Sequence, residues 1–159
     1  MKVSEHISEN EEYIRSTCEN CDDVIIRPMK LGEGQKTDCL VAFIEVAVSN
    51  MMLEDSVVGK FINQLWTLPE EQMRSFVEKN GAGISDTGTF ETLEKALESM
   101  LAGNAIFFMD GYDKAVKISS KGYPSMGVTK AESEKVLRGS KEGFADSVKV
   151  NTALIRKRV

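Results

Sequence analysis

Two pairs of strand-like runs, each pair joined by a turn signal, constrain most strongly what this chain can fold into. The clearer turn signal is Asp110-Gly111, a dipeptide favoured in tight hairpin turns, and the other is Gly32-Glu33-Gly34. The four apolar runs beside these turns are Val24–Ile26, Cys39–Ile44, Ala105–Met109 and Ala115–Ile118. Because a hairpin pairs its strands antiparallel, the sequence predicts a four-stranded sheet that is antiparallel or mixed.

Apolar residues at helical spacing predict helices before and between these hairpins. A polar helix is expected over Ser8–Cys21, and Asn50 introduces a second helical pattern that includes Phe61. Thr67–Glu70 fits a capping box that opens a third helix, which is expected to end at Asn80-Gly81. The apolar residues predicted for the buried face of this third helix are Met73, Phe76 and Val77.

Two more helices complete the expected order of elements. Thr89 is predicted to cap a helix that buries Phe90 and Leu93 and ends at Gly103. A terminal helix is predicted around Phe144, Val148, Thr152 and Ile155, which share one face. Strands grouped around helices indicate an α/β (α+β) fold in which helices pack on one face of the sheet, with a helix at the C-terminal end.

The length of 159 residues, with 42% hydrophobic side chains, suits one compact unit with its own core. We expect an α/β core subdomain over residues 1–120, followed by a loop and the terminal helix over residues 121–159. The longest apolar stretches are much shorter than a membrane span, and Met1–Asn10 has no apolar segment typical of a secretory signal. The sequence therefore predicts a soluble, intracellular chain.

The formal charge of −5 is distributed unevenly. Residues 1–23 carry seven acidic and two basic side chains, whereas residues 121–159 carry four acidic and nine basic ones. Two interpretations are an attraction between the acidic head and the basic tail, and a tail that faces an anionic surface or nucleic acid. A third is that these charges are ordinary solvated faces.

The scarcity of histidine and cysteine argues against most enzyme chemistry. His6 is the single histidine, so a Ser-His-Asp or Cys-His arrangement is not expected. Cys18 and Cys21 form a C-x-x-C pair among acidic residues, which disfavour a thiolate, and a thiol redox protein is the enzyme alternative. No zinc-ligand spacing accompanies the pair, and the glycine clusters fail the context required for a nucleotide-binding loop. We therefore predict no catalytic residue, no metal site and no cofactor.

The C-terminal third carries a longer pattern. Val136–Arg158 resembles the signature V-x-R-G-x-R-E-G-F-x-E-x-x-x-x-N-x-A-L-I-R-x-R of GerA-type spore germinant receptor A subunits (the GerA/GerK/GerB A-subunit family). Leu101–Gly111 is similar to that family's L-x-G-x-x-x-x-F-x-D-G segment. Ser140, Lys141 and Asp146 depart from the family pattern, but charge and shape are largely retained. The residues to which the resemblance assigns binding or interaction are Arg138, Gly139, Glu142, Gly143, Phe144, Asn151, Arg156 and Arg158.

The resemblance implies a role in spore germination without catalysis. Family members are longer, with a second soluble subdomain and then transmembrane helices, so this chain corresponds to the first part of the soluble N-terminal domain. The resemblance implies assembly with receptor B and C subunits and other A subunits, and response to a small nutrient germinant. It also implies a place at the spore inner membrane through the downstream part, the fragment itself being soluble, and no nucleic-acid partner.

Overall fold

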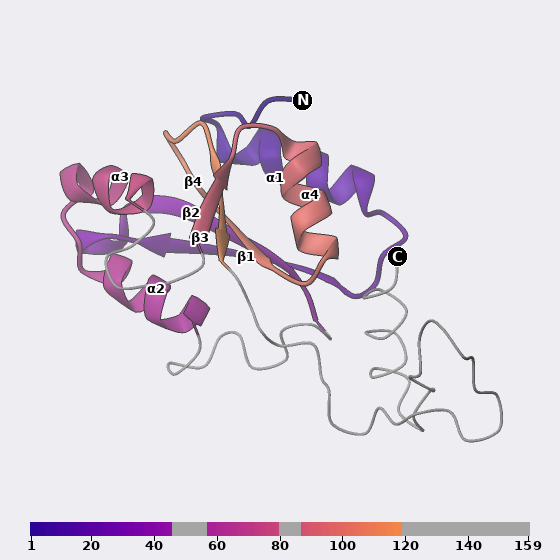
Figure 1. Cartoon of the computed structure of the whole chain (residues 1–159). Coiled ribbons are helices and arrows are strands. Elements are labelled where there is room, and N and C mark those ends of the chain that lie inside the picture. Colours follow the sequence, from indigo (N-terminus) through magenta and orange to yellow (C-terminus); the bar gives the residue numbers. More distant parts are fainter. Residues whose placement is uncertain (46–56, 80–86, 119–159) are drawn as a thin grey trace, which may run out of the picture.

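The structure is a computed structural model that describes residues 1–45, 57–79 and 87–118. These residues form one antiparallel sheet of five strands in the order β1-β2-β4-β5-β3 (Figure 1). The strands are β1 (Val24–Leu31), β2 (Thr37–Ile44), β3 (Thr87–Phe90), β4 (Ala105–Met109) and β5 (Ala115–Ile118). The helices are α1 (Ile7–Thr17), α2 (Val57–Trp66), α3 (Glu70–Glu78), α4 (Leu93–Leu101) and the short 3-10 turn η1 (Glu33–Gln35).

Both predicted hairpins are present. Strand β1 pairs with β2 from Val24↔Ile44 to Leu31↔Thr37, and β4 pairs with β5 across the Asp110-Gly111 turn. The turn glycines have the positive φ angles that such turns require, +88° at Gly32 and +79° at Gly111. Strand β1 also contains Pro28, which a sheet accepts there because β1 is an edge strand.

Helices cover both faces of the sheet, whereas the sequence predicted helices on one face only. Helices α1 and α4 lie on one side of strands β3, β4 and β5, and α2 and α3 lie on the other (Figure 1). All five residues of β4 are buried, although successive side chains point to opposite faces. The ring centroids of Phe107 and Phe61 of α2 are 5.0 Å apart, and those of Phe61 and Phe76 of α3 are 5.6 Å apart. The second helical layer is therefore required to bury the face of β4 that carries Phe107.

The segment before α4 departs from the sequence prediction. Thr89 and Phe90 do not start a helix but belong to β3, where Phe90 pairs with Ala115 of β5. The helix begins later, at Leu93, with Thr92 as its N-cap. It ends at Leu101, and Gly103, the predicted stop, follows the C-cap Ala102 with a φ of +103°. The sheet therefore has five strands where the sequence predicted four, because pairing with β5 outweighs the helical spacing of Phe90 and Leu93.

Other helix ends differ by a few residues. Helix α1 ends at Thr17, before Cys18, and α3 begins at Glu70 with Pro69 as its N-cap and no side-chain cap, so Thr67 does not form the predicted capping box. Met73 and Val77 are buried and Phe76 is half-buried, which confirms the predicted inner face of α3. The predicted helix start at Asn50, the end at Asn80-Gly81, the terminal helix and the division at residue 121 fall outside the described residues.

The amino-terminal segment ties several elements together. Asn10 of α1 is buried, and its side chain both accepts from the Ser4 N–H and donates to the Ser4 carbonyl, each at 2.8 Å. Earlier in the same segment, Lys2 forms an isolated antiparallel bridge with Thr92, just before α4. Without its two hydrogen bonds to the Ser4 backbone, the buried Asn10 amide would destabilise the fold by about 1–3 kcal/mol. In the parts of the chain that the structure describes, none of the helices has the length and apolar character needed to cross a bilayer.

We expect Gly32→Ala to destabilise the protein more than Gly111→Ala. Both glycines have positive φ, so an added Cβ strains each by a similar amount, about 1–2 kcal/mol. A Cβ at Gly32 would also lie 2.5 Å from the Met73 Sδ atom of α3, whereas a Cβ at Gly111 has no atom within 4 Å. Urea unfolding should therefore show an additional loss of about 1–3 kcal/mol for Gly32→Ala. Equal losses in the two variants would contradict the close packing of α3 on this turn.

Candidate functional site

The eight residues that the family pattern assigns to binding or interaction lie outside the described residues. They are Arg138, Gly139, Glu142, Gly143, Phe144, Asn151, Arg156 and Arg158. The basic tail, on which the anionic-surface or nucleic-acid alternative depends, lies there too. The structure describes the surroundings of the other candidates, which are the cysteines, the histidine, the acidic residues 1–23 and the Leu101–Gly111 segment.

The Cys18-x-x-Cys21 pair lies at the C-terminal end of α1. The Cys18 N–H donates to the Ile14 carbonyl, and the Cys21 N–H donates to the Cys18 carbonyl, both at 2.9 Å. A redox C-x-x-C motif lowers the thiol pKa at the opposite end of a helix, where the dipole is positive. Cys18 and Cys21 instead follow Thr17, the last residue of α1, at the negative end of the helix dipole. This position counts against the thiol redox alternative.

The third cysteine is placed where it cannot act as a nucleophile at neutral pH. Cys39 lies in β2 and is buried. Burial, followed by the negative charges of Asp38 and Asp110, raises the pKa of its thiol from 9.0 to about 12. The thiol is therefore protonated at neutral pH and serves packing in the core.

His6 and the acidic side chains are the other candidates for catalysis or metal binding. His6 is exposed and occupies the N-cap position of α1 without a side-chain capping bond. Within residues 1–45, 57–79 and 87–118, no group of three or more histidine, cysteine or acidic side chains is placed to hold a metal ion.

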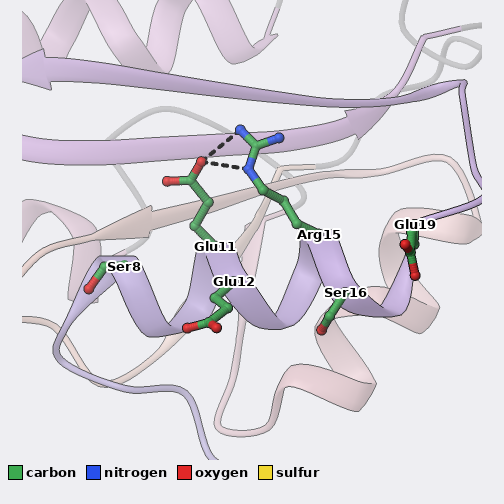
Figure 2. Close-up of a pocket in the computed structure, with 6 residues that line it drawn as sticks. All are labelled: Ser8, Glu11, Glu12, Arg15, Ser16 and Glu19. Atoms are coloured by element: carbon green, nitrogen blue, oxygen red, sulfur yellow. Dashed lines mark hydrogen bonds and ion pairs between the residues drawn. The ribbon is translucent and has the colours of Figure 1, made fainter.

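A shallow hollow of about 540 Å³ lies along the exposed face of α1 (Figure 2). Arg15 folds back onto Glu11, with the Nη2 atom 2.7 Å from Oε1, as Figure 2 shows. The described residues that line the hollow are Ser8, Glu11, Glu12, Arg15, Ser16 and Glu19. Three carboxylates against one guanidinium make this surface acidic, in agreement with the charge of residues 1–23. These residues form no recognised motif, although the i, i+3, i+4 spacing of those within α1 shows that they share one helix face.

The Leu101–Gly111 segment has a defined structural role. It runs from the last residue of α4 through β4 into the turn that leads to β5. In that turn, the Asp110 carboxylate accepts from the Ile7 N–H at 3.1 Å, so it caps the first turn of α1. The Asp110 N–H donates to the Asp38 carbonyl at 2.9 Å, and the Gly111 N–H donates to the Glu5 carbonyl at 2.8 Å. The segment thus fixes the amino-terminal helix against the sheet.

The fold is that of a known receptor domain. It resembles the crystal structure of the N-terminal domain of the A subunit of the Bacillus megaterium spore germinant receptor GerK3, with a TM-score of 0.70 and 19% sequence identity. The similarity covers 100% of this chain and 56% of that chain. At this identity the likeness establishes the fold, and the sequence establishes the family.

The family profile described as "Bacillus/Clostridium GerA spore germination protein" matches residues 12–159. The chain therefore belongs to the GerA spore germination protein family, as the Val136–Arg158 and Leu101–Gly111 patterns predicted.

Individual relatives agree with this assignment. The chain is 30% identical over 158 residues to the uncharacterized membrane protein YfkQ of Bacillus subtilis strain 168, covering 99% of this chain and 30% of that protein. It is 28% identical over 160 residues to spore germination protein A1 of the same organism, covering 99% of this chain and 31% of that protein. The chain thus spans about three-tenths of the length of these relatives.

We expect the burial of Cys39 to make stability fall at alkaline pH. The thiol pKa is higher in the folded state, about 12, than its ordinary 9.0, so the folded state retains a proton that the unfolded chain loses. The stabilising effect is complete below the ordinary pKa and is lost as the pH rises through the folded one, at up to about 1.4 kcal/mol per pH unit. Urea unfolding at neutral and alkaline pH measures this slope, and Cys39→Ala should reduce it. An unchanged slope in Cys39→Ala would show that other groups cause the loss.

Proposed function

We propose that this chain is the first part of the soluble N-terminal domain of a germinant receptor A subunit, and that it acts without catalysis. In that role it contributes to germinant sensing, receptor assembly and signal transmission during spore germination. The match of residues 12–159 to the GerA family carries this proposal. The shared fold with the N-terminal domain of the GerK3 A subunit supports it.

The chemistry of the described residues is compatible with a role through contacts. The C-x-x-C pair lies at the wrong end of a helix for a reactive thiolate, and the Cys39 thiol is protonated and buried. A receptor domain of this kind transmits a signal when a ligand or a neighbouring subunit favours one of two conformations over the other.

The partners in this proposal are receptor B and C subunits, other A subunits and a small nutrient germinant. We place the full-length subunit at the spore inner membrane, held there by a downstream part, with this chain as a soluble domain. The name of the relative YfkQ describes a membrane protein of which this chain covers 30%, in keeping with that arrangement. Nucleic acid has no part in the proposed function.

The residues proposed to carry the interaction are those of the family pattern. We propose that Arg138 and Glu142, four positions apart, would pair or anchor the loop to a following helix, and that Gly139 and Gly143 would allow backbone conformations that side chains hinder. In this proposal Asn151 would satisfy backbone groups of an adjoining element, and Phe144 would pack in the core. On a helix, Arg156 and Arg158 would point in different directions, so at most one of them would meet a given partner surface.

We expect Arg138→Ala in the full-length subunit to slow nutrient-triggered spore germination, because it removes the charge that pairs with Glu142. The loss of spore refractility after nutrient addition measures the response, and immunoblotting of spore membranes measures the subunit level. Arg138→Lys keeps the charge without the bidentate geometry and should have a smaller effect. A normal response of Arg138→Ala spores at normal subunit level would contradict the role of this residue.

A deletion separates the role of Arg138 from the proposed function as a whole. Spores that lack the full-length subunit should lose the response to its nutrient while a nutrient-independent trigger still germinates them. A normal response to every nutrient in those spores would overturn the function itself, whatever Arg138→Ala does.

A further inference from the structure

The turn between β4 and β5, Asp110–Asp113, contacts the two helical layers on opposite faces of the sheet. On the side of α1, Asp110 caps the helix through the Ile7 N–H at 3.1 Å. The next residue, Gly111, donates its N–H to the carbonyl of Glu5, just before α1, at 2.8 Å. Two adjacent turn residues therefore hold the start of α1.

The next residue of the same turn faces the other layer. Tyr112 is buried, with 3% of its surface exposed, and the Arg74 guanidinium of α3 lies 5.8 Å from the centroid of its ring. This distance is within the range of a cation–π contact. Arg74 also pairs with Glu78 one turn along α3, with Nε 3.1 Å from Oε1. The hydrogen bond to the Glu78 carboxylate, followed by the charges of Glu78, Asp113 and Glu5, raises the pKa of Arg74, which places these acidic groups near it.

A second contact joins α3 to the sheet at the neighbouring hairpin. Met73 of α3 packs against Gly32, and the Gly32 and Glu33 N–H groups donate to the Leu65 and Leu68 carbonyls at 3.1 and 2.8 Å. That contact does not involve Asp110–Asp113. The contact of Arg74 with Tyr112 joins α3 directly to the β4–β5 turn.

We propose that the Asp110–Asp113 turn couples the packing of α3 to the start of α1, so that loosening one helical layer loosens the other. The physical reason is the shortness of the turn: the residues that hold α1 and the residue that holds α3 are consecutive, and the backbone between them is fixed by the Asp110 and Gly111 hydrogen bonds. A shift of Tyr112 therefore strains the bonds of its neighbours. The proposal concerns motion within this chain and does not depend on the proposed receptor function.

The test is amide hydrogen exchange, measured by NMR on the 159-residue chain. We expect Arg74→Ala to speed exchange of the Ile7 and Gly111 amides by about two- to fivefold, the range set by an exposed cation–π contact. The Gly103 amide donates to the Met100 carbonyl at 2.9 Å, just before β4 begins and so at the opposite end of that strand from the turn. Its exchange should be unchanged where it occurs by local opening, because that opening does not break the Arg74–Tyr112 contact.

Two matched variants separate the aromatic contact from the other roles of Arg74. Glu78→Gln removes the ion pair within α3 but leaves Arg74 over Tyr112, so the Ile7 and Gly111 amides should exchange as in the unaltered chain. Arg15→Ala removes the corresponding Glu11 pair of α1, which lies away from the turn, and should also leave both amides unchanged.

The reverse direction provides an independent readout. Asp110→Ala removes the cap of α1, and the proposal predicts that it speeds exchange of the α3 amides and shifts the Tyr112 ring resonances. Normal Ile7 and Gly111 exchange in Arg74→Ala would overturn the proposal. The same conclusion follows if Gly103 exchange rises equally, or if Glu78→Gln reproduces the effect of Arg74→Ala.

Discussion

Burial of β4 on both faces is the constraint on which the rest of the structure depends. A strand whose five residues are all buried needs a layer on each side, and the Phe107 ring cannot be covered by α1 and α4 because they lie on the other face. Helix α2 supplies Phe61 at 5.0 Å and α3 supplies Phe76 behind it. Burying one phenylalanine side chain contributes about 1.5–3 kcal/mol, so these aromatic contacts outweigh any single surface ion pair in holding the second layer.

The family pattern acquires a physical meaning in this fold. Leu101–Gly111 contains the glycine that ends α4, the buried strand β4, and the turn whose Asp110 caps α1. Those parts are the points at which α4, the sheet and α1 are joined. In a domain that works by contact with neighbours, these joints determine whether a displacement at one surface stays local or also moves the adjoining elements.

The sequence predicted the hairpins because their turns carry strong local signals, whereas β3 was missed because its signal is ambiguous. Phe90 lies three residues before Leu93, so it fits a helix face equally well, and pairing with β5 decides the outcome. The second helical layer was not predicted because an apolar run such as Cys39–Ile44 does not reveal whether one or both faces are buried. Local context predicted that Cys18 and Cys21 close a helical pattern, and the structure places both just after the end of α1. Arg74 and Tyr112 carried no signal at all, since they are 38 positions apart and only the fold brings them together.

The magnitudes indicate what kind of signal such a domain can carry. A helix cap contributes about 0.5–2 kcal/mol and an exposed cation–π contact about 0.5–1 kcal/mol, while coupling between sites in allosteric proteins is typically 1–3 kcal/mol. If the β4–β5 turn couples the two layers as proposed, its contacts are strong enough to shift a balance between two packings and too weak to lock either one. In such a shift the aromatic contacts of Phe61 would keep the second layer folded on the sheet, because they do not pass through the turn. Such a domain would keep its fold while its helices adjust, as a receptor subunit that works by contact requires.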